Sequence, residues 1–274
     1  MWFLALAVLL AALALLLLLS AGQAWLQRRR LRRRVPVKRA PRLRHPVVLL
    51  HGVLGFDEIA IAGRKHRYFR NIAEKLADLD AEFHHPRLPA VASVSVRAEN
   101  LAELVQAMPG SRVNVIAHSM GGLDARFAIS RLGLDRRVAS LVTIGAPHHG
   151  TPLADFSLSR RMSRFLHVPA LTDLTPESLL RFNREVPDAA GVAYCSVVAS
   201  SDLIHTNPLL WPTHAYLSAK SGPNDGLVPT ASQRWGKVLR EIHADHWAQV
   251  GWSIRFDAAA LYEEILRELA ALGF

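Results

Sequence analysis

The sequence predicts an α/β domain with a mostly parallel sheet and helices on both of its faces. Short apolar runs rich in β-branched residues alternate with segments whose apolar residues recur at helical spacing. Glycine or proline closes several of these segments and marks the boundaries between elements. Alternation of strands and helices along the chain is typical of parallel sheets that are covered by helices.

The expected elements run in order along the chain. Strands are predicted at 46–52 (PVVLLHG), 112–118 (RVNVIAH), 137–147 (RVASLVTIGAP) and 192–200 (VAYCSVVAS). Helices are predicted at about 65–79, 99–108, 121–133 and 257–272. In parallel sheets, functional groups gather at the carboxyl ends of the strands, so the segments that follow these strands are the place to look for a site.

Composition is that of a globular protein with one main domain. The chain has 274 residues, half of them hydrophobic, which is enough for one sizeable core. Its single cysteine, Cys195, excludes an intrachain disulfide. That cysteine usage fits a reducing compartment without requiring one.

The net charge of +10 comes from one short segment. Residues 27–44 contain ten of the 33 basic residues, and residues 1–44 contain no acidic residue. The rest of the chain therefore balances 23 basic against 23 acidic residues. The charge belongs to a linker rather than to the folded domain, and it does not indicate a nucleic-acid-binding protein.

The first 26 residues form an uncharged apolar stretch, which is long enough to span a bilayer as a helix. We expect residues 1–26 to be a membrane anchor, 27–45 a basic linker and 46–274 the folded domain. Because positive charge follows the apolar stretch, the domain is expected on the cytoplasmic side. The alternative is an exported protein whose signal peptide is cleaved at small residues within 21–24 (AGQA).

A serine follows the second expected strand in the pentapeptide AHSMG, residues 117–121. A serine between small residues at a strand–turn–helix bend holds its hydroxyl out for attack. Ala117 replaces the first glycine of the usual G-x-S-x-G pattern, and Gly121 keeps the second. We therefore predict that Ser119 is a nucleophile. The alternative is that Ser119 only caps the following helix.

The segment HGVLGF, residues 51–56, ends the first expected strand. Acyl transfer needs hydrogen-bond donors at the oxyanion that develops on the attacked carbonyl. The expected donors are the backbone amides of Val53 and Met120. The alternative for this segment is an ordinary glycine-rich turn.

An acid and a base follow the serine in chain order. Asp225 lies in the turn signal NDG, and His246 lies in DHWAQVG near the C-terminal helix. A serine hydroxyl needs a base to accept its proton, and a carboxylate orients the base and stabilises its cation. We therefore predict a Ser119–His246–Asp225 triad.

Other residues compete for these roles. Asp202 is an alternative acid, and His243, within an expected strand, is an alternative base. His148 and His149 follow a strand but are interpreted as shaping a loop. The sequence contains no HExxH motif, paired cysteines, phosphate loop or dinucleotide fingerprint.

Taken together, these motifs resemble the bacterial triacylglycerol lipases of the α/β-hydrolase superfamily. The resemblance covers most of residues 46–251 in register, through VVLLHGVLGF, VNVIAHSMGGLDAR, LVTIGAPHHGTPLADF, LTDLTPESLLRFN, SGPNDGLVP and DHWAQVG. It implies an α/β-hydrolase fold, with Ser119 as nucleophile, Asp225 as acid, His246 as base, and Val53 and Met120 as amide donors to the oxyanion.

The resemblance also implies a calcium site, but this sequence differs from these lipases at two of the ligand positions. Two aspartates hold the ion in these lipases, and the corresponding positions here are His214 and Ala248. Neither residue supplies a carboxylate, and Ca²⁺ requires several hard oxygen ligands. We therefore expect no cofactor. We expect packing, for instance by Trp247, to hold the loop that contains His246, which we call the histidine loop.

Residues 150–187 interrupt the alternation of strands and helices and are rich in apolar side chains. They are interpreted either as a helical cap over an acyl pocket or as peripheral core-packing helices. The expected activity is hydrolysis of lipid or other acyl esters by a serine ester hydrolase. The alternatives are an acyltransferase or phospholipase that uses the same triad, and a membrane-tethered scaffold with an inert fold.

Overall fold

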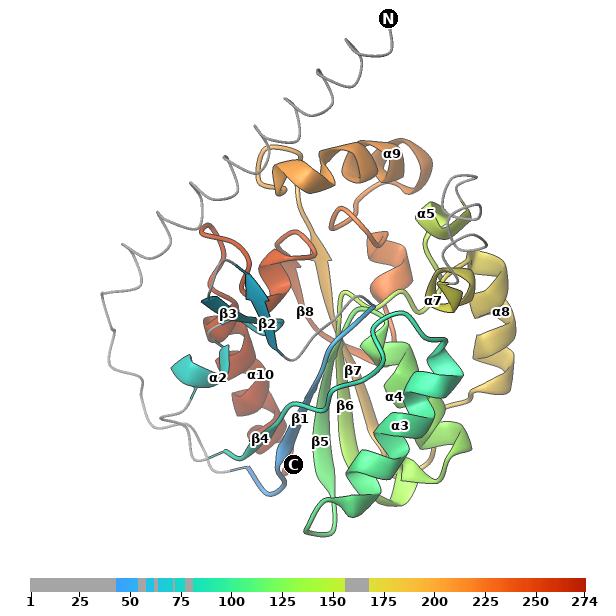
Figure 1. Ribbon diagram of the computed structural model, residues 1–274, viewed down its shortest axis with the longest axis vertical. Coiled ribbons are helices and arrows are strands. Elements are labelled where there is room, and N and C mark those ends of the chain that lie inside the picture. The colour runs from blue at the N-terminus through green and yellow to red at the C-terminus, as the bar shows by residue number, and fades with distance from the viewer. Residues whose placement is uncertain (1–42, 54–57, 62–63, 71, 77–80, 156–167) are drawn as a thin grey trace, which may run out of the picture.

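The computed structural model describes residues 43–53, 58–61, 64–70, 72–76, 81–155 and 168–274. Its centre is a six-stranded sheet in the order β4-β1-β5-β6-β7-β8, and every pairing in it is parallel (Figure 1). The strands span Phe83–His84 (β4), Val47–Leu50 (β1), Val113–His118 (β5), Val138–Ile144 (β6), Ala193–Ser200 (β7) and Lys237–His243 (β8). The predicted parallel α/β architecture is confirmed.

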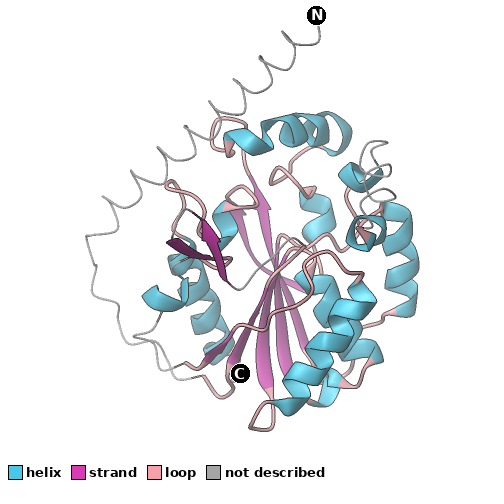
Figure 2. Cartoon of the chain, viewed as in Figure 1, coloured by secondary structure: helices cyan, strands magenta, loops and turns pink. Residues whose placement is uncertain are grey.

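Helices cover both faces of this sheet (Figure 2). One face packs against α3 (Val94–Ala107) and α4 (Gly121–Arg131), and the other packs against α2 (Ile72–Lys75) and α10 (Ala258–Ala271). Alternate residues of β1 serve the two cores: Val47 and Leu49 belong to one, Val48 and Leu50 to the other. Burial on both faces explains why the strands read as continuous apolar runs in the sequence.

The described residues also form the helices α5 (Pro152–Asp155), α7 (Pro169–Asp173), α8 (Pro176–Glu185) and α9 (Trp211–Ser221). Figure 1 shows α5 and α9 beyond the carboxyl ends of the strands. Helices α5, α7 and α8 fall within the expected cap at 150–187, but residues 156–167 of that cap lie outside the described residues.

One predicted helix is wrong. Residues 65–79 were expected to be helical, but Arg64–Arg67 (β3) pairs antiparallel with Glu58–Ile61 (β2). Among the described residues of the expected range, Ile72–Lys75 forms a helix, α2. Strand pairing with a neighbouring segment overrides the local helical spacing here.

The helix expected at 99–108 is confirmed but begins earlier. Helix α3 starts at Val94, because the Ser93 hydroxyl accepts a hydrogen bond from the Val96 amide and caps the first turn. The strands expected at 46–52, 112–118, 137–147 and 192–200 are confirmed, as are the helices expected at 121–133 and 257–272.

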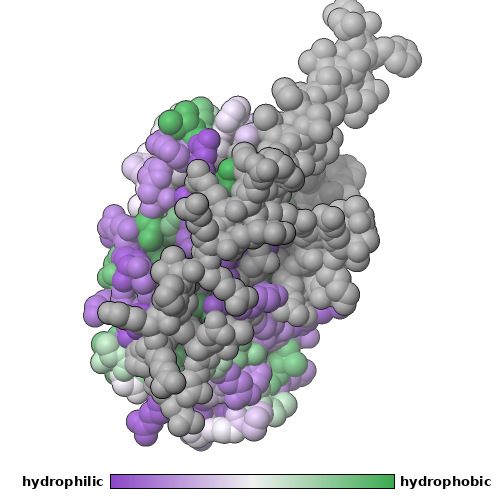
Figure 3. Space-filling view, turned by 90° about the vertical axis from the view of Figure 1, so that its left-hand side faces the viewer, coloured by the Kyte–Doolittle hydropathy of each residue, from purple (hydrophilic) through white to green (hydrophobic). Residues whose placement is uncertain are grey.

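No helix within the described ranges is long and apolar enough to cross a membrane. The expected anchor, residues 1–26, lies outside those ranges. On the face shown in Figure 3, the described residues form a mostly hydrophilic surface with scattered hydrophobic groups.

Candidate active site

Ser119 lies at a sharp turn between the end of β5 and the start of α4. Its φ is 57°, and among the described residues it is the one non-glycine residue with positive φ. This left-handed conformation costs a residue with a Cβ about 1–2 kcal/mol, so the surroundings must hold it. The Ser119 N–H donates to the Ile144 carbonyl at 2.9 Å, and no side chain caps α4. The Ser119 hydroxyl therefore does not cap the helix.

Two glycines allow the carboxyl end of β1 to lie very close to this turn. A Cβ on Gly52 would lie 2.7 Å from the Cβ of Ser119, and a Cβ on Gly121 would lie 2.8 Å from the His51 carbonyl oxygen. Both distances are shorter than side chains tolerate. The close approach brings the segment that contains Val53 beside Ser119.

The end of β1 is fixed by a buried guanidinium. Arg97, on α3, donates from Nη2 to the His51 carbonyl and from Nε to Asp124 Oδ2, both at 2.8 Å. Arg97 and Asp124 are both fully buried. Removing either partner would leave an unpaired buried charge, so this contact holds His51 in a defined position.

The amides of Val53 and Met120 make no hydrogen bond to other residues within the described ranges. Met120 is fully buried and directly follows Ser119, whereas Val53 follows Gly52, which contacts Ser119. Two amide donors without a partner among the described residues therefore belong to segments that adjoin the serine. This arrangement is suited to an anion that is present only transiently.

Asp225 and His246 form a buried pair. His246 Nδ1 donates to Asp225 Oδ2 at 2.8 Å, and Gln249 Nε2 donates to the same oxygen at 2.8 Å. The other carboxylate oxygen accepts the backbone amides of Leu227 and Val228 at 3.0 and 2.8 Å. With four donors, Asp225 is held as an acceptor that orients the imidazole.

His246 lies beside the Ser119 turn. Its ring centroid is 4.5 Å from that of His118, the residue before Ser119, and its backbone carbonyl is 3.1 Å from His118 Nε2. Within the described part of the chain, Ser119 Oγ makes no hydrogen bond. The structure thus joins Asp225 to His246 and brings His246 to the turn, but it shows no bond from His246 to the serine.

A polar chain that sequence reasoning missed connects these parts. Burial, together with the nearby His246, lowers the pKa of His118 well below its usual value, so the imidazole is neutral. His118 Nε2 therefore donates to the His246 carbonyl, and Nδ1 accepts from the Tyr68 hydroxyl at 2.7 Å. That hydroxyl accepts the Gly52 amide at 3.3 Å.

Little in the sequence indicates this series of hydrogen bonds. His118 adjoins Ser119 in the motif, but Tyr68 lies in a segment that was interpreted as helix. This series of hydrogen bonds runs from Gly52 at the end of β1, through Tyr68 and His118, to the backbone of His246. It therefore links the two segments that lie beside Ser119.

The competing residues lie elsewhere. Asp202 contacts His205 and His243 on the surface rather than His246. His148 is buried, its Nε2 lies 3.0 Å from the Thr143 hydroxyl, and burial lowers its pKa well below the usual value. Its backbone carbonyl accepts the Asn183 side-chain amide, which agrees with a loop-shaping role.

Neither position at which the resemblance implies a calcium ligand carries a carboxylate. Ala248 is buried in a short 3₁₀ helix, and His214 Nε2 lies 2.7 Å from the Ser201 carbonyl. The histidine loop is instead tied by Asp245, whose Oδ2 accepts the Asn207 amide at 2.8 Å. Its Oδ1 accepts the amides of Trp247 and Ala248. The Asp245 carboxylate therefore joins the loop that contains Asn207 to the loop that contains His246.

Comparisons with known proteins agree with this fold. A family model described as a domain of unknown function, DUF7379, matches residues 17–200. A triacylglycerol lipase of Pseudarthrobacter phenanthrenivorans is 34% identical, and the match covers 74% of this chain and 86% of the relative. A triacylglycerol lipase of Pseudomonas fragi is 25% identical over 84% of this chain and 97% of that protein.

Solved structures share the fold. The metagenomic carboxyl esterase MGS0156 has a TM-score of 0.76 at 23% identity, over 87% of this chain and 79% of its own. The mature Bacillus licheniformis lipase BlEst2 has a TM-score of 0.67 at 19% identity, over 85% of this chain and 94% of its own.

Fold and relatives together define the class of this protein, which is an ester hydrolase of the α/β-hydrolase type. More particularly, the chain belongs to the DUF7379 family. It also belongs to the bacterial triacylglycerol lipases and esterases, as its motifs predicted.

Proposed function

We propose that this protein hydrolyses carboxylic esters of lipids through a Ser119–His246–Asp225 triad. The observation that carries the proposal is the buried Asp225–His246 hydrogen bond beside a serine held at φ 57°. Such strain at a non-glycine residue is characteristic of functional sites.

In the proposed reaction, His246 Nε2 takes the proton from Ser119 Oγ as the oxygen attacks the ester carbonyl. The carbonyl oxygen becomes an anion that accepts hydrogen bonds from the backbone amides of Val53 and Met120. His246 then protonates the departing alcohol, which leaves an acyl-enzyme. Water, deprotonated by His246, attacks the acyl carbon and releases the carboxylic acid and free Ser119.

The test is Ser119→Ala, assayed with p-nitrophenyl esters and by labelling with a fluorophosphonate probe. Both signals should vanish. Ser111→Ala is the matched control, since Ser111 is exposed and precedes β5, at the opposite end of that strand from Ser119. Persistent labelling of Ser119→Ala would refute the assignment, and absent labelling of the unmodified chain would favour an inert scaffold.

Triacylglycerols are the proposed substrate class, because the curated relatives are named triacylglycerol lipases. An acyltransferase or phospholipase would use the same acyl-enzyme, with a different donor or acceptor. Product analysis with water competing against alcohols or lysolipids separates these activities. Free fatty acid as the main product supports the hydrolase, whereas acylated acceptors as the main product would overturn it.

We also propose that the enzyme works without calcium, since His214 and Ala248 offer no carboxylate and Asp245 ties the loops directly. Calcium should leave the melting temperature of the chelator-treated protein unchanged. An increase of several degrees that a chelator reverses would contradict this proposal.

The apolar sequence of residues 1–26 and the basic segment after it support a further proposal, that the enzyme is anchored in the cell membrane with its domain on the cytoplasmic side. Alkaline carbonate should then fail to extract the chain, and external protease should not cut it in spheroplasts. Recovery of a shortened chain from the periplasm would show instead that the segment is a signal peptide.

A further inference from the structure

Three side chains with metal-ligating atoms meet on the surface near the candidate active site: Asp202, His205 and His243. One ligand atom from each lies within 4.8 Å of the other two. His205 Nδ1 is 2.6 Å from Asp202 Oδ1, and His243 Nε2 is 3.6 Å from Asp202 Oδ2. The proposed reaction uses none of these groups.

The fold brings the three residues together in a simple way. His243 ends β8 and pairs with Ser200 at the end of β7, so Asp202 follows its strand by two residues and stands beside His243. A tight turn then returns the chain, because the amides of His205 and Thr206 both donate to the Asp202 carbonyl. That turn places the His205 imidazole against the Asp202 carboxylate.

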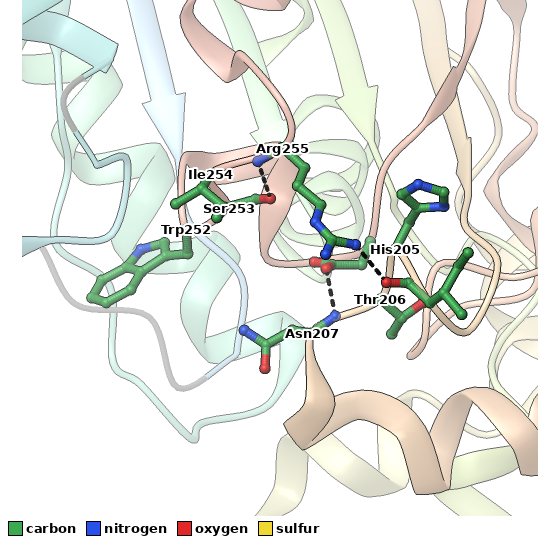
Figure 4. Close-up of a pocket in the computed structure, with 9 residues that line it drawn as sticks. His205, Thr206, Asn207, Trp252, Ser253, Ile254 and Arg255 are labelled. Carbon is green, nitrogen blue, oxygen red and sulfur yellow. Dashed lines mark hydrogen bonds between the residues drawn. The ribbon is translucent and has the colours of Figure 1, made fainter. Parts of the chain in front are cut away.

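Neighbouring contacts hold this turn. The Ser201 and Thr206 hydroxyls lie 2.6 Å apart, and Arg255 donates to the Ile204 carbonyl at 2.7 Å. Figure 4 shows His205, Asn207 and Arg255 among the residues that line a pocket next to this turn. The Asn207 amide in this pocket donates to the Asp245 carboxylate. The backbone that carries two of the three ligands is therefore fixed.

We propose that Asp202, His205 and His243 form a binding site for one divalent transition-metal ion, with Zn²⁺ as the best fit. Two imidazole nitrogens and one carboxylate oxygen suit Zn²⁺, whereas Ca²⁺ prefers oxygen ligands alone. Ligand atoms at about 2.0–2.2 Å from a tetrahedral ion lie about 3.4 Å apart. The side chains of His205, Asp202 and His243 are 45%, 53% and 56% exposed, so small rotations would bring their ligand atoms to that spacing.

The ion would join the loop after β7 to the end of β8. His243 lies two residues before Asp245 and three before His246, and Asn207 of the same loop already binds Asp245. Metal binding at Asp202, His205 and His243 would therefore hold the histidine loop from a second point. Since the folded chain presents the ligands together, binding raises the stability of the native state.

The experiment uses the full chain in mild detergent, free of any affinity tag and treated with EDTA that is then removed. Titration with Co²⁺ should give the visible absorption of a tetrahedral nitrogen–oxygen site and saturate at one ion per chain. One equivalent of Zn²⁺ should displace the Co²⁺. Zn²⁺ at about a hundredfold excess over its dissociation constant should raise the melting temperature by about 5 °C or more.

His243→Ala and Asp202→Asn should each abolish the cobalt spectrum and the zinc-dependent stabilisation. His84→Ala is the matched control, because His84 pairs with a single carboxylate, Glu82, at 3.1 Å. This control should keep both signals. The melting temperatures of the metal-free variants show that each one folds. An unchanged cobalt spectrum in His243→Ala, or binding of several equivalents that His84→Ala reduces equally, would overturn the proposal.

Discussion

Two aspartate–histidine clusters lie close together in this chain and differ in their surroundings. In the buried one, Asp225 and His246 are 2.8 Å apart with side chains 0% and 5% exposed. In the surface one, Asp202 and His205 are 2.6 Å apart with side chains 53% and 45% exposed. Distance alone does not separate the proposed catalytic pair from the surface pair. The two clusters differ in that Asp225 accepts further hydrogen bonds and is shielded from water, whereas Asp202 is exposed.

The largest effect is expected when the buried acid loses its charge. Asp225→Asn keeps the shape of the side chain but favours the wrong imidazole tautomer, so kcat should fall about 10⁴-fold. Steady-state hydrolysis of p-nitrophenyl esters measures this. Asp135→Asn, in the 3₁₀ helix that precedes β6, is the control and should retain full activity. A loss of less than tenfold in Asp225→Asn would mean that the buried pair is not the catalytic one.

The packing around Ser119 gives the next effect. Gly52→Ala places a Cβ 2.7 Å from the Ser119 Cβ, so the end of β1 must move away from the turn. A displacement of about 1 Å in a catalytic group costs about 10² in rate. Gly133→Ala is the control for backbone strain without steric contact, because its φ is 74° and a Cβ there meets no atom within 4 Å. Equal activity of Gly52→Ala and the unmodified chain would show that this contact does not position the site.

Tyr68 sharpens the comparison, because its hydrogen bonds lead through His118 to the backbone of His246 in the buried pair. Tyr68→Phe removes the hydroxyl that accepts the Gly52 amide and donates to His118. Leaving the Gly52 amide and His118 Nδ1 unpaired costs about 1–3 kcal/mol. Because part of this cost falls on the transition state, kcat should fall about tenfold while KM stays constant. Tyr194→Phe is the control, since its hydroxyl accepts the Ala189 amide in the same way. A fall in stability at constant kcat would leave Tyr68 a structural residue only.

Much of this site is local in the sequence, and the remainder is not. The β5–Ser119–α4 turn could be predicted, because an apolar run, a serine and small residues adjoin in the chain. Asp225 and His246 could be predicted from a turn signal and chain order. Gln249 and Tyr68 could not, since their contacts depend on how distant loops fold back. The helix expected at 65–79 failed for the same reason, because the strand partner of β3 decides its conformation.

The buried imidazoles predict how stability depends on pH. Burial lowers the pKa of His118 and His148 well below 6.5, whereas both groups have ordinary values when unfolded. Below pH 6.5 the unfolded chain therefore binds more protons, and the native state loses stability as the pH falls. Between pH 6.5 and 5.5 each group should cost about 1 kcal/mol. Urea unfolding at both values measures this, and His148→Gln should reduce the pH dependence by about half. An unchanged pH dependence would contradict the assignment.

The smallest effect is expected at the surface cluster without metal. In EDTA, Asp202→Asn should change the melting temperature by less than about 2 °C, because an exposed pair is screened by water and its partners remain solvated. Asp225→Asn should lower it more, since that substitution disturbs four buried hydrogen bonds. Differential scanning calorimetry compares the two variants. If Asp202→Asn destabilised the metal-free chain as much as Asp225→Asn, burial would not be what distinguishes the two clusters. Equal effects would mean that the Asp202 carboxylate stabilises the native state without metal. Any stabilisation by zinc would then add to a contribution that the cluster already makes.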